Sequence, residues 1–270
     1  MNTHAPLPLR KITIKLERAH ADPLVVPVEL PATPTTFVGI MPAVRSIADA
    51  LQDDALQTVA RMGRPATCGL GCDTCCRHLV MLGEAEALGL LRTLAALPEA
   101  RQAGIRSRFQ AGLDRVEAAG LLPRLYAVFT RTASDHIAQA EMQAAYWELG
   151  IPCPFLEDQA CGIYAERPLV CRQYAMSSPP QNCRTPFGPQ TALVKVLPSL
   201  DLAGAAAAFD GELAQQTRLL PLIFCLLRET HLSLRAFPVL EPERMLTRYL
   251  DFATTYYPRK DTHHIIMERA

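Results

Sequence analysis

The sequence predicts a mainly α-helical protein with a single domain, because long stretches of helical periodicity surround two short segments rich in cysteine. The chain has 270 residues, of which 49% are apolar and 20% charged. This balance is typical of a globular protein that buries its own core. The formal net charge is zero, so neither nucleic acid nor an anionic membrane is expected as a partner.

No apolar stretch has the length of a secretion signal or of a membrane span, and the strongest run, 219–227, is interrupted by Pro221. We therefore expect a cytoplasmic protein. Cysteines rarely form disulfides in the reducing cytosol. The nine cysteines are then better explained as metal ligands, since all but Cys225 fall in two groups.

The first 40 residues are predicted to form an extended segment. Ile12, Ile14 and Leu16 alternate with polar residues, which is the pattern of a half-buried strand. A second extended run, 25–30, lies between two prolines. The two runs predict either a small hairpin or an arm that crosses the surface.

A helical cysteine-cluster domain is predicted for residues 41–258, and a flexible tail for residues 259–270. Glycine and proline residues mark the expected helix ends, and an apolar stripe from Ile105 to Val116 marks the face of one helix that packs on the core. The expected elements are helices at 42–62, 83–97, 98–120 and 123–147 (with a break near Ser134), a strand at 193–197, and helices at 200–220, 222–232 and 241–256.

The first cysteine group, residues 68–76, reads CGLGCDTCC, and the second spans residues 153–183 among several prolines. Short spacings let several sulfurs converge on one metal, and the two glycines let the backbone turn tightly around it. The predicted metal ligands are Cys68, Cys72, Cys75, Cys76, Cys153, Cys161, Cys171 and Cys183.

Eight thiolates suit two four-cysteine sites, or one iron–sulfur cluster together with a zinc ion. The side chains of Cys75 and Cys76 diverge because the residues are neighbours, so they bind different metals or one of them bridges. Iron is favoured over zinc, because the C-x3-C-x2-C spacing is close to spacings that hold iron–sulfur clusters. Cys225 lies in an apolar run and is predicted to be a small buried side chain.

These segments resemble the YkgJ-type cysteine-cluster family of zinc- or iron-chelating proteins. The family pattern is a C-x3-C-x2-C-C group, then C-P-F-L, C-x-I-Y, R-P-x-x-C-R and a last cysteine. This chain carries each piece between Cys68 and Cys183. The resemblance implies a metal-binding protein that acts as a metal-dependent binding or maturation module.

An enzyme is the alternative, because the family is similar to the flagellin lysine N-methylase, which uses S-adenosylmethionine. That similarity implies a protein-modifying N-methyltransferase with a protein or peptide substrate. The chain has no glycine-rich strand–turn–helix that would hold the methyl donor. The first three cysteines also fit radical S-adenosylmethionine enzymes, but Thr74 replaces the usual aromatic residue and the βα units of that fold are missing.

Further residues are candidates for a role beside the metal. Arg167 and Arg172 flank Cys171 and are predicted to offset thiolate charge or to bind an anionic cofactor or substrate. His78 is a possible nitrogen ligand, although a solvated or core-edge position is favoured. The aromatic and remaining histidine candidates are Phe155, Tyr164 and Tyr174, expected as apolar cover, and His263 and His264, expected as a solvated pair.

Overall fold

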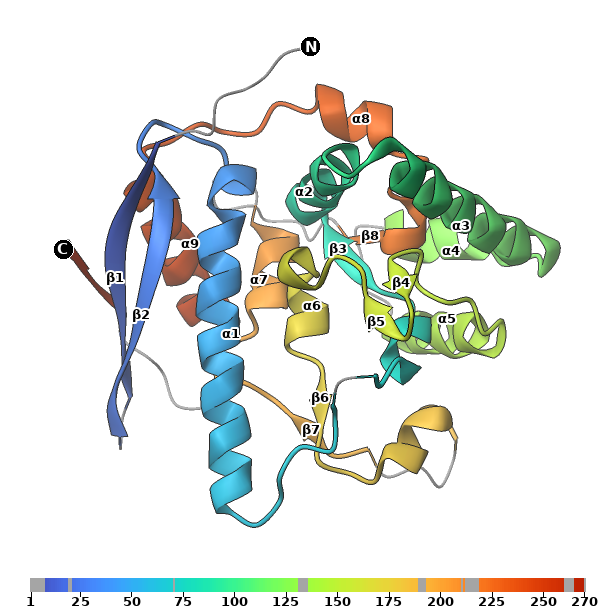
Figure 1. Cartoon of the computed structure of the whole chain (residues 1–270), viewed down its shortest axis with the longest axis horizontal. Coiled ribbons are helices and arrows are strands. Elements are labelled where there is room, and N and C mark those ends of the chain that lie inside the picture. Colours follow the sequence, from blue (N-terminus) through green and yellow to red (C-terminus); the bar gives the residue numbers. More distant parts are fainter. Residues whose placement is uncertain are drawn as a thin grey trace.

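The computed structural model describes residues 8–18, 21–69, 71–130, 136–188, 193–209, 211, 219–259 and 265–269. Helices dominate this part of the chain, and the sheets are small. Figure 1 shows one long helix, α1, with the β1–β2 sheet and α9 on one side and the cysteine segments with α2–α6 on the other. None of the helices in the described ranges combines the length and the apolar character that crossing a bilayer requires.

The N-terminal strands form a hairpin, as one of the two predictions states. Strand β1 (Leu9–Arg18) pairs antiparallel with β2 (Ala21–Pro31), so that Ile12 lies opposite Val28. The side chains of Ile12, Ile14 and Leu16 are buried, because the hairpin places this apolar face on α1.

The end of the chain differs from the expected flexible tail. Residues 265–269 form β9 (Ile265–Arg269), which pairs antiparallel with β1. Strand β1 has a free edge on the side away from β2, and its backbone groups offer hydrogen bonds that the terminal segment uses. His263 and His264 lie outside the described residues.

Helix α1 (Phe37–Arg61) begins before Pro42, where the sequence predicts its start. Phe37 is buried between Phe209 and Tyr249, with ring centroids 4.9 Å from each. Burial of Phe37 and Ile40 outweighs the local cost of a proline inside the helix. Tertiary packing therefore determines the first turn of α1.

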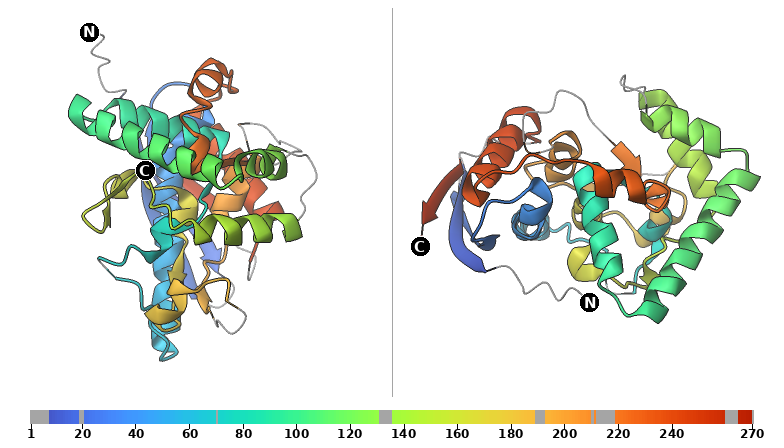
Figure 2. Two further views of the ribbon diagram at one scale, coloured as in Figure 1. Left: turned by 90° about the vertical axis from the view of Figure 1, so that its right-hand side faces the viewer. Right: turned by 90° about the horizontal axis from the view of Figure 1, so that it is seen from above.

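The next helices agree with prediction in approximate position, and the last two of them occupy the stretch predicted at 123–147. They are α2 (Glu84–Ala95), α3 (Glu99–Ala118), α4 (Leu122–Thr130) and α5 (His136–Glu148). The predicted break near Ser134 falls between α4 and α5, outside the described residues. The predicted stripe on α3 is buried at Ile105, Phe109 and Val116. Viewed from above, α2–α5 lie on the side opposite the sheet (Figure 2).

The C-terminal region contains less helix than predicted at 200–232. Helix α7 (Leu202–Ala208) is short, and β8 (Leu219–Pro221) pairs with β3 (Met81–Gly83). A Cβ on Gly83 would lie 2.6 Å from the carbonyl oxygen of Ala206, so the close approach of β3 to α7 requires glycine. The remaining elements of this region are η4 (Leu222–Phe224), α8 (Glu229–Leu234) and α9 (Pro242–Tyr256).

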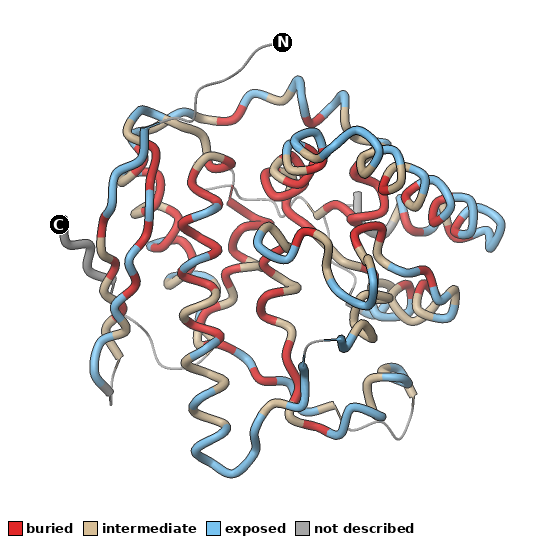
Figure 3. The backbone as a smooth tube through the Cα atoms, viewed as in Figure 1, coloured by how far each residue is buried: buried red, intermediate tan, exposed pale blue. Residues whose placement is uncertain are grey.

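Short elements carry or connect the cysteines between α1 and α7. They are η1 (Thr74–Arg77), β4 (Leu156–Glu157), β5 (Ala160–Cys161), η2 (Tyr164–Glu166), α6 (Leu169–Arg172), β6 (Ala175–Met176), η3 (Pro180–Arg184) and β7 (Lys195–Val196). Figure 3 shows the buried core running through α1, α2 and α7, whereas the end of α1 and the segment after it are exposed.

Candidate metal centre

The first cysteine segment leaves α1 and runs along the surface before it turns inward at η1. Gly71 has φ +83, a left-handed conformation that glycine adopts without strain. The N–H of Cys72 donates a hydrogen bond to the carbonyl oxygen of Gly69, with an N–O distance of 3.1 Å. This turn lies directly before η1, which carries Cys75 and Cys76, and Cys68 is within electrostatic range of Cys72 and Cys75.

The second cysteine segment is tied directly to the first. The N–H of Cys153 donates to the carbonyl oxygen of Cys76, with an N–O distance of 2.6 Å. The β4–β5 hairpin carries Cys161. Glu157 on this hairpin accepts hydrogen bonds from Arg101 and Arg108 of α3. The predicted helical insert therefore returns the chain to its starting point and also holds the second segment.

Helix α6 carries Cys171 and is anchored from behind by two buried charged residues. Glu86 of α2 accepts a hydrogen bond from the N–H of Leu169, with an N–O distance of 2.9 Å. Arg172 donates to the carboxylate of Asp49 and to the carbonyl oxygens of Arg167 and Ala165. The backbone around Cys171 is thus held in place by Asp49 of α1 and Glu86 of α2.

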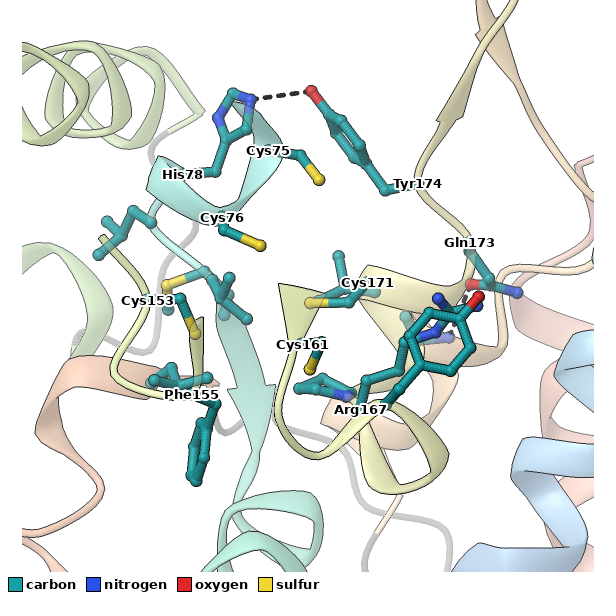
Figure 4. Close-up of a pocket in the computed structure, with 18 of the residues that line it drawn as sticks. Cys75, Cys76, His78, Cys153, Phe155, Cys161, Arg167, Cys171, Gln173 and Tyr174 are labelled. Atoms are coloured by element: carbon teal, nitrogen blue, oxygen red, sulfur yellow. Dashed lines mark hydrogen bonds between the residues drawn. The ribbon is translucent and has the colours of Figure 1, made fainter. Parts of the chain in front are cut away.

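Both cysteine groups line one cavity, which has a volume of about 480 Å³. Figure 4 shows the sulfur atoms of Cys75, Cys76, Cys161 and Cys171 directed toward a common space, with Cys153 beside it. Cys72 also lines the cavity. The remaining two predicted ligands, Cys68 and Cys183, lie next to it, within electrostatic range of Cys72 and Cys75.

Cys75 connects the two groups. It lies within electrostatic range of both segments, and the thiols around it are Cys68, Cys76, Cys153, Cys161, Cys171 and Cys183. Sequence position therefore does not decide which cysteines are neighbours: Cys183, from the second segment, lies with Cys68 and Cys72 of the first.

Burial raises the pKa of several thiols in this arrangement, including Cys68, Cys161 and Cys183. Burial raises the pKa of Cys153 to about 12 and the pKa of Cys171 well above its usual range. A hydrogen bond with Cys76, followed by burial, raises the pKa of Cys75. Within the described ranges, no three cysteine, histidine, aspartate or glutamate side chains have the mutual spacing of a metal site. Metal binding would therefore displace protons and draw the sulfurs together.

The two predicted cofactor-binding arginines occupy different places. Arg167 lines the cavity, its guanidinium lies 3.9 Å from the ring centroid of Tyr164, and its buried Nε has no hydrogen-bond partner among the described residues. It is within electrostatic range of Cys75 and Cys161. Arg172 lies behind the cavity wall, where its guanidinium binds the backbone.

His78 lies in an aromatic cluster at the cavity wall. Its Nε2 is hydrogen-bonded to the hydroxyl of Tyr174 at 2.9 Å, and its ring packs against those of Trp147 and Phe187. Burial and then the charge of Lys195 lower the pKa of His78 to about 4. The ring is therefore neutral near pH 7, in agreement with a core-edge position.

Several residues of the site have no sequence signal that would identify them. Trp147 and Lys195 lie outside the cysteine motifs, and Glu86 looks like an ordinary acidic residue in the first turn of a helix. Only the fold brings them to the cavity or behind it.

Cys225 is buried in the core and does not line the cavity. We expect Cys225→Ala to keep the full metal content and to lower the free energy of unfolding by about 1 kcal/mol, because only a small buried side chain is lost. Metal analysis and urea denaturation of the variant test this. Loss of a whole metal equivalent would identify Cys225 as a ligand.

Glu86 predicts a pH dependence of stability. Burial raises its pKa from 4.5 to about 7, although hydrogen bonds from Leu169 and Gly83 oppose this shift. The folded protein therefore holds this proton more tightly than the unfolded chain. The stabilising contribution is complete below about pH 4.5 and is lost as the pH rises to about 7.

The variant Glu86→Gln cannot titrate at this position. The free energy of unfolding of the variant minus that of the wild type should therefore increase as the pH rises from about 4.5 to about 7, because only the wild type loses stability over this range. Urea denaturation at a series of pH values measures the difference. Glu148→Gln, at an exposed position, is the matched control, and a difference that stays constant with pH for Glu86→Gln would contradict the prediction.

The comparison with protein-family models agrees with this site. Residues 67–187 match the model of the CxxCxxCC family, which is described as a "Putative zinc- or iron-chelating domain". The matched segment contains all eight of the predicted ligands. No curated protein and no solved structure matches the chain. The match over residues 67–187 agrees with the resemblance of the two cysteine segments to YkgJ-type proteins.

Proposed function

We propose that this protein binds zinc or iron through the thiolates of both cysteine segments and acts as a metal-dependent binding or maturation module. The observation that carries the proposal is the cavity, which gathers cysteines that are far apart in the sequence around one space. Free cysteines that only fill a core would not need to line a cavity.

The chemistry of the residues fits a metal held by sulfur. Thiolates are strong ligands of zinc and of iron–sulfur clusters, and a bound metal ion favours the deprotonated form of a thiol even where burial opposes it. Several thiolates together carry negative charge. Arg167, whose buried Nε has no partner and which lies near Cys75 and Cys161, is positioned to offset that charge.

Iron is proposed as the native metal in preference to zinc. The spacing of the first three cysteines and the adjacent Cys75 and Cys76 suit a polynuclear iron–sulfur site. Protein purified without oxygen should be brown and should contain iron and sulfide in matched amounts. A colourless protein with stoichiometric zinc, from cells supplied with iron, would contradict this choice while supporting a metal-binding function.

A second candidate function is an S-adenosylmethionine-dependent protein N-methylase. The size of the cavity favours it: about 480 Å³ lies in the range of small-molecule sites and exceeds what one ion requires. Part of the wall carries no sulfur and contains Lys195, Asp201 and Arg259. Equilibrium dialysis with radiolabelled S-adenosylmethionine tests this candidate. Saturable binding that an alanine substitution of Arg259 weakens would support it, and no binding to the metal-loaded protein would reject it.

A further inference from the structure

The predicted ligands differ in how far solvent reaches them. Cys68 and Cys72 are exposed, whereas the others of the eight are partly buried. Cys68 and Cys72 have Cys183 as their neighbour from the second segment. We call these three residues the outer set. Cys76, Cys153, Cys161 and Cys171 line the cavity and are partly buried, and they form the inner set; Cys72 also borders the cavity but is exposed. Cys75 lies between the two sets.

The backbone of the inner set is held to the core. Cys171 lies on α6, which Glu86 and Arg172 anchor. The hairpin of Cys161 is fixed by the ion pairs of Glu157 with α3. Little backbone entropy remains to be lost when these sulfurs bind a metal, and apolar residues such as Phe155 exclude water from behind.

The outer set lies on less constrained chain. Residues 61–72 are exposed except for Ala66, and residue 70 is outside the described ranges. Hydrogen bonds tie this segment to β6 and Ser178 at Thr67 and Cys68. The N–H of Thr67 donates to the carbonyl oxygen of Met176 at 2.8 Å, the hydroxyl of Thr67 donates to the carbonyl oxygens of Met176 and Ser178, and the N–H of Met176 donates to the sulfur of Cys68 at 3.3 Å. An incoming ligand can therefore approach an ion held here from the solvent side.

We propose that the two sets hold metal separately, that the inner metal is retained, and that the outer set with Cys75 is the place where metal enters and leaves. This inference rests on the proposed function, because it presupposes cysteine-bound metal. Exchange is a ligand substitution: bonds from the metal to sulfur are replaced by bonds to the incoming ligand, and each released thiolate takes up a proton from water. No electron transfer is involved.

The experiment uses the full chain, stripped of metal under reducing conditions without oxygen and reloaded with Zn²⁺ alone. The chromogenic chelator 4-(2-pyridylazo)resorcinol then removes the zinc, and the absorbance records its release. We expect two equivalents and two phases of release, with rates that differ by about tenfold or more because solvent access differs. Cys183→Ser should remove the fast phase and leave the slow one.

Arg184→Ala, which changes the exposed neighbour of Cys183, is the matched control and should keep both phases. Cys183→Ser alters a position at the edge of the site, so the variant is expected to fold, and circular dichroism checks this. Release in a single phase, binding of only one equivalent, or loss of the slow phase in Cys183→Ser would each overturn the inference and leave cysteine-bound metal in place. Failure of the wild type to bind either Zn²⁺ or Fe²⁺ supplied without oxygen would instead overturn the proposed function.

Discussion

Replacement of Cys161 by serine is expected to lower both the metal content and the melting temperature of the protein. Cys161 belongs to the second cysteine segment but lines the same cavity as Cys75 and Cys76 of the first. A structural metal contributes on the order of 10 kcal/mol to folding, and serine is a poor ligand for zinc or iron. Removing one thiolate should therefore weaken the site and lose a large part of this contribution.

Metal analysis and calorimetry of the loaded proteins measure the effect. Cys225→Ala is the matched control, because it removes a thiol that lies outside the cavity. Comparison of the metal-free forms separates loss of the metal from loss of packing, since the metal-free variant and wild type should melt at similar temperatures. Unchanged metal content in Cys161→Ser would show that the two segments do not form one metal region.

Substitution of Arg172 by alanine has the second largest expected effect. The guanidinium is buried and bridges Asp49 of α1 to the carbonyl oxygens of Arg167 and Ala165. Without it, buried carbonyl groups lose their donors and Asp49 loses its partner. We expect the metal-free protein to lose about 3 kcal/mol of stability, because buried polar groups without partners are costly.

The same substitution should weaken metal binding by about tenfold or more, because Arg172 holds the segment that carries Cys161 and Cys171. Denaturation of the metal-free protein and a zinc competition titration give the two quantities separately. Arg172→Lys should retain little of the stability or zinc affinity that Arg172→Ala loses, since a lysine cannot bridge three acceptors with a planar group. Full stability in Arg172→Ala would contradict the anchoring role, and Arg184→Ala controls for loss of an exposed arginine.

The sequence by itself determined those features that depend on local pattern. The alternation around Ile14 predicted the strand of the hairpin, because side chains in a strand point to opposite faces. Periodicity and terminal glycine and proline residues located α2, α3 and α9 within a few residues. The spacing of the cysteines and the motifs around them predicted the two cysteine segments as one unit and indicated the family whose model matches residues 67–187, since such motifs can be read from neighbouring residues alone.

Tertiary structure decided the features that depend on contacts between distant segments. The early start of α1 requires Phe209 and Tyr249 around Phe37, and the strand β8, predicted as helix, requires pairing with β3. The different positions of the two arginines of the second cysteine segment also depend on contacts between distant segments. Arg167 and Arg172 are equivalent by motif, yet only the fold places one at the cavity and the other against Asp49.

The grouping of the cysteines is the feature of the site that the sequence could least determine. Cys183 lies near Cys68 and Cys72, whereas Cys153 lies beside Cys76, to which it is joined by a backbone hydrogen bond. Which sulfurs meet depends on how α2–α5 return the chain and how α6 is anchored. Spacing in the sequence limits distances only between cysteines of the same segment. The distances between cysteines of different segments are set by the packing of the core.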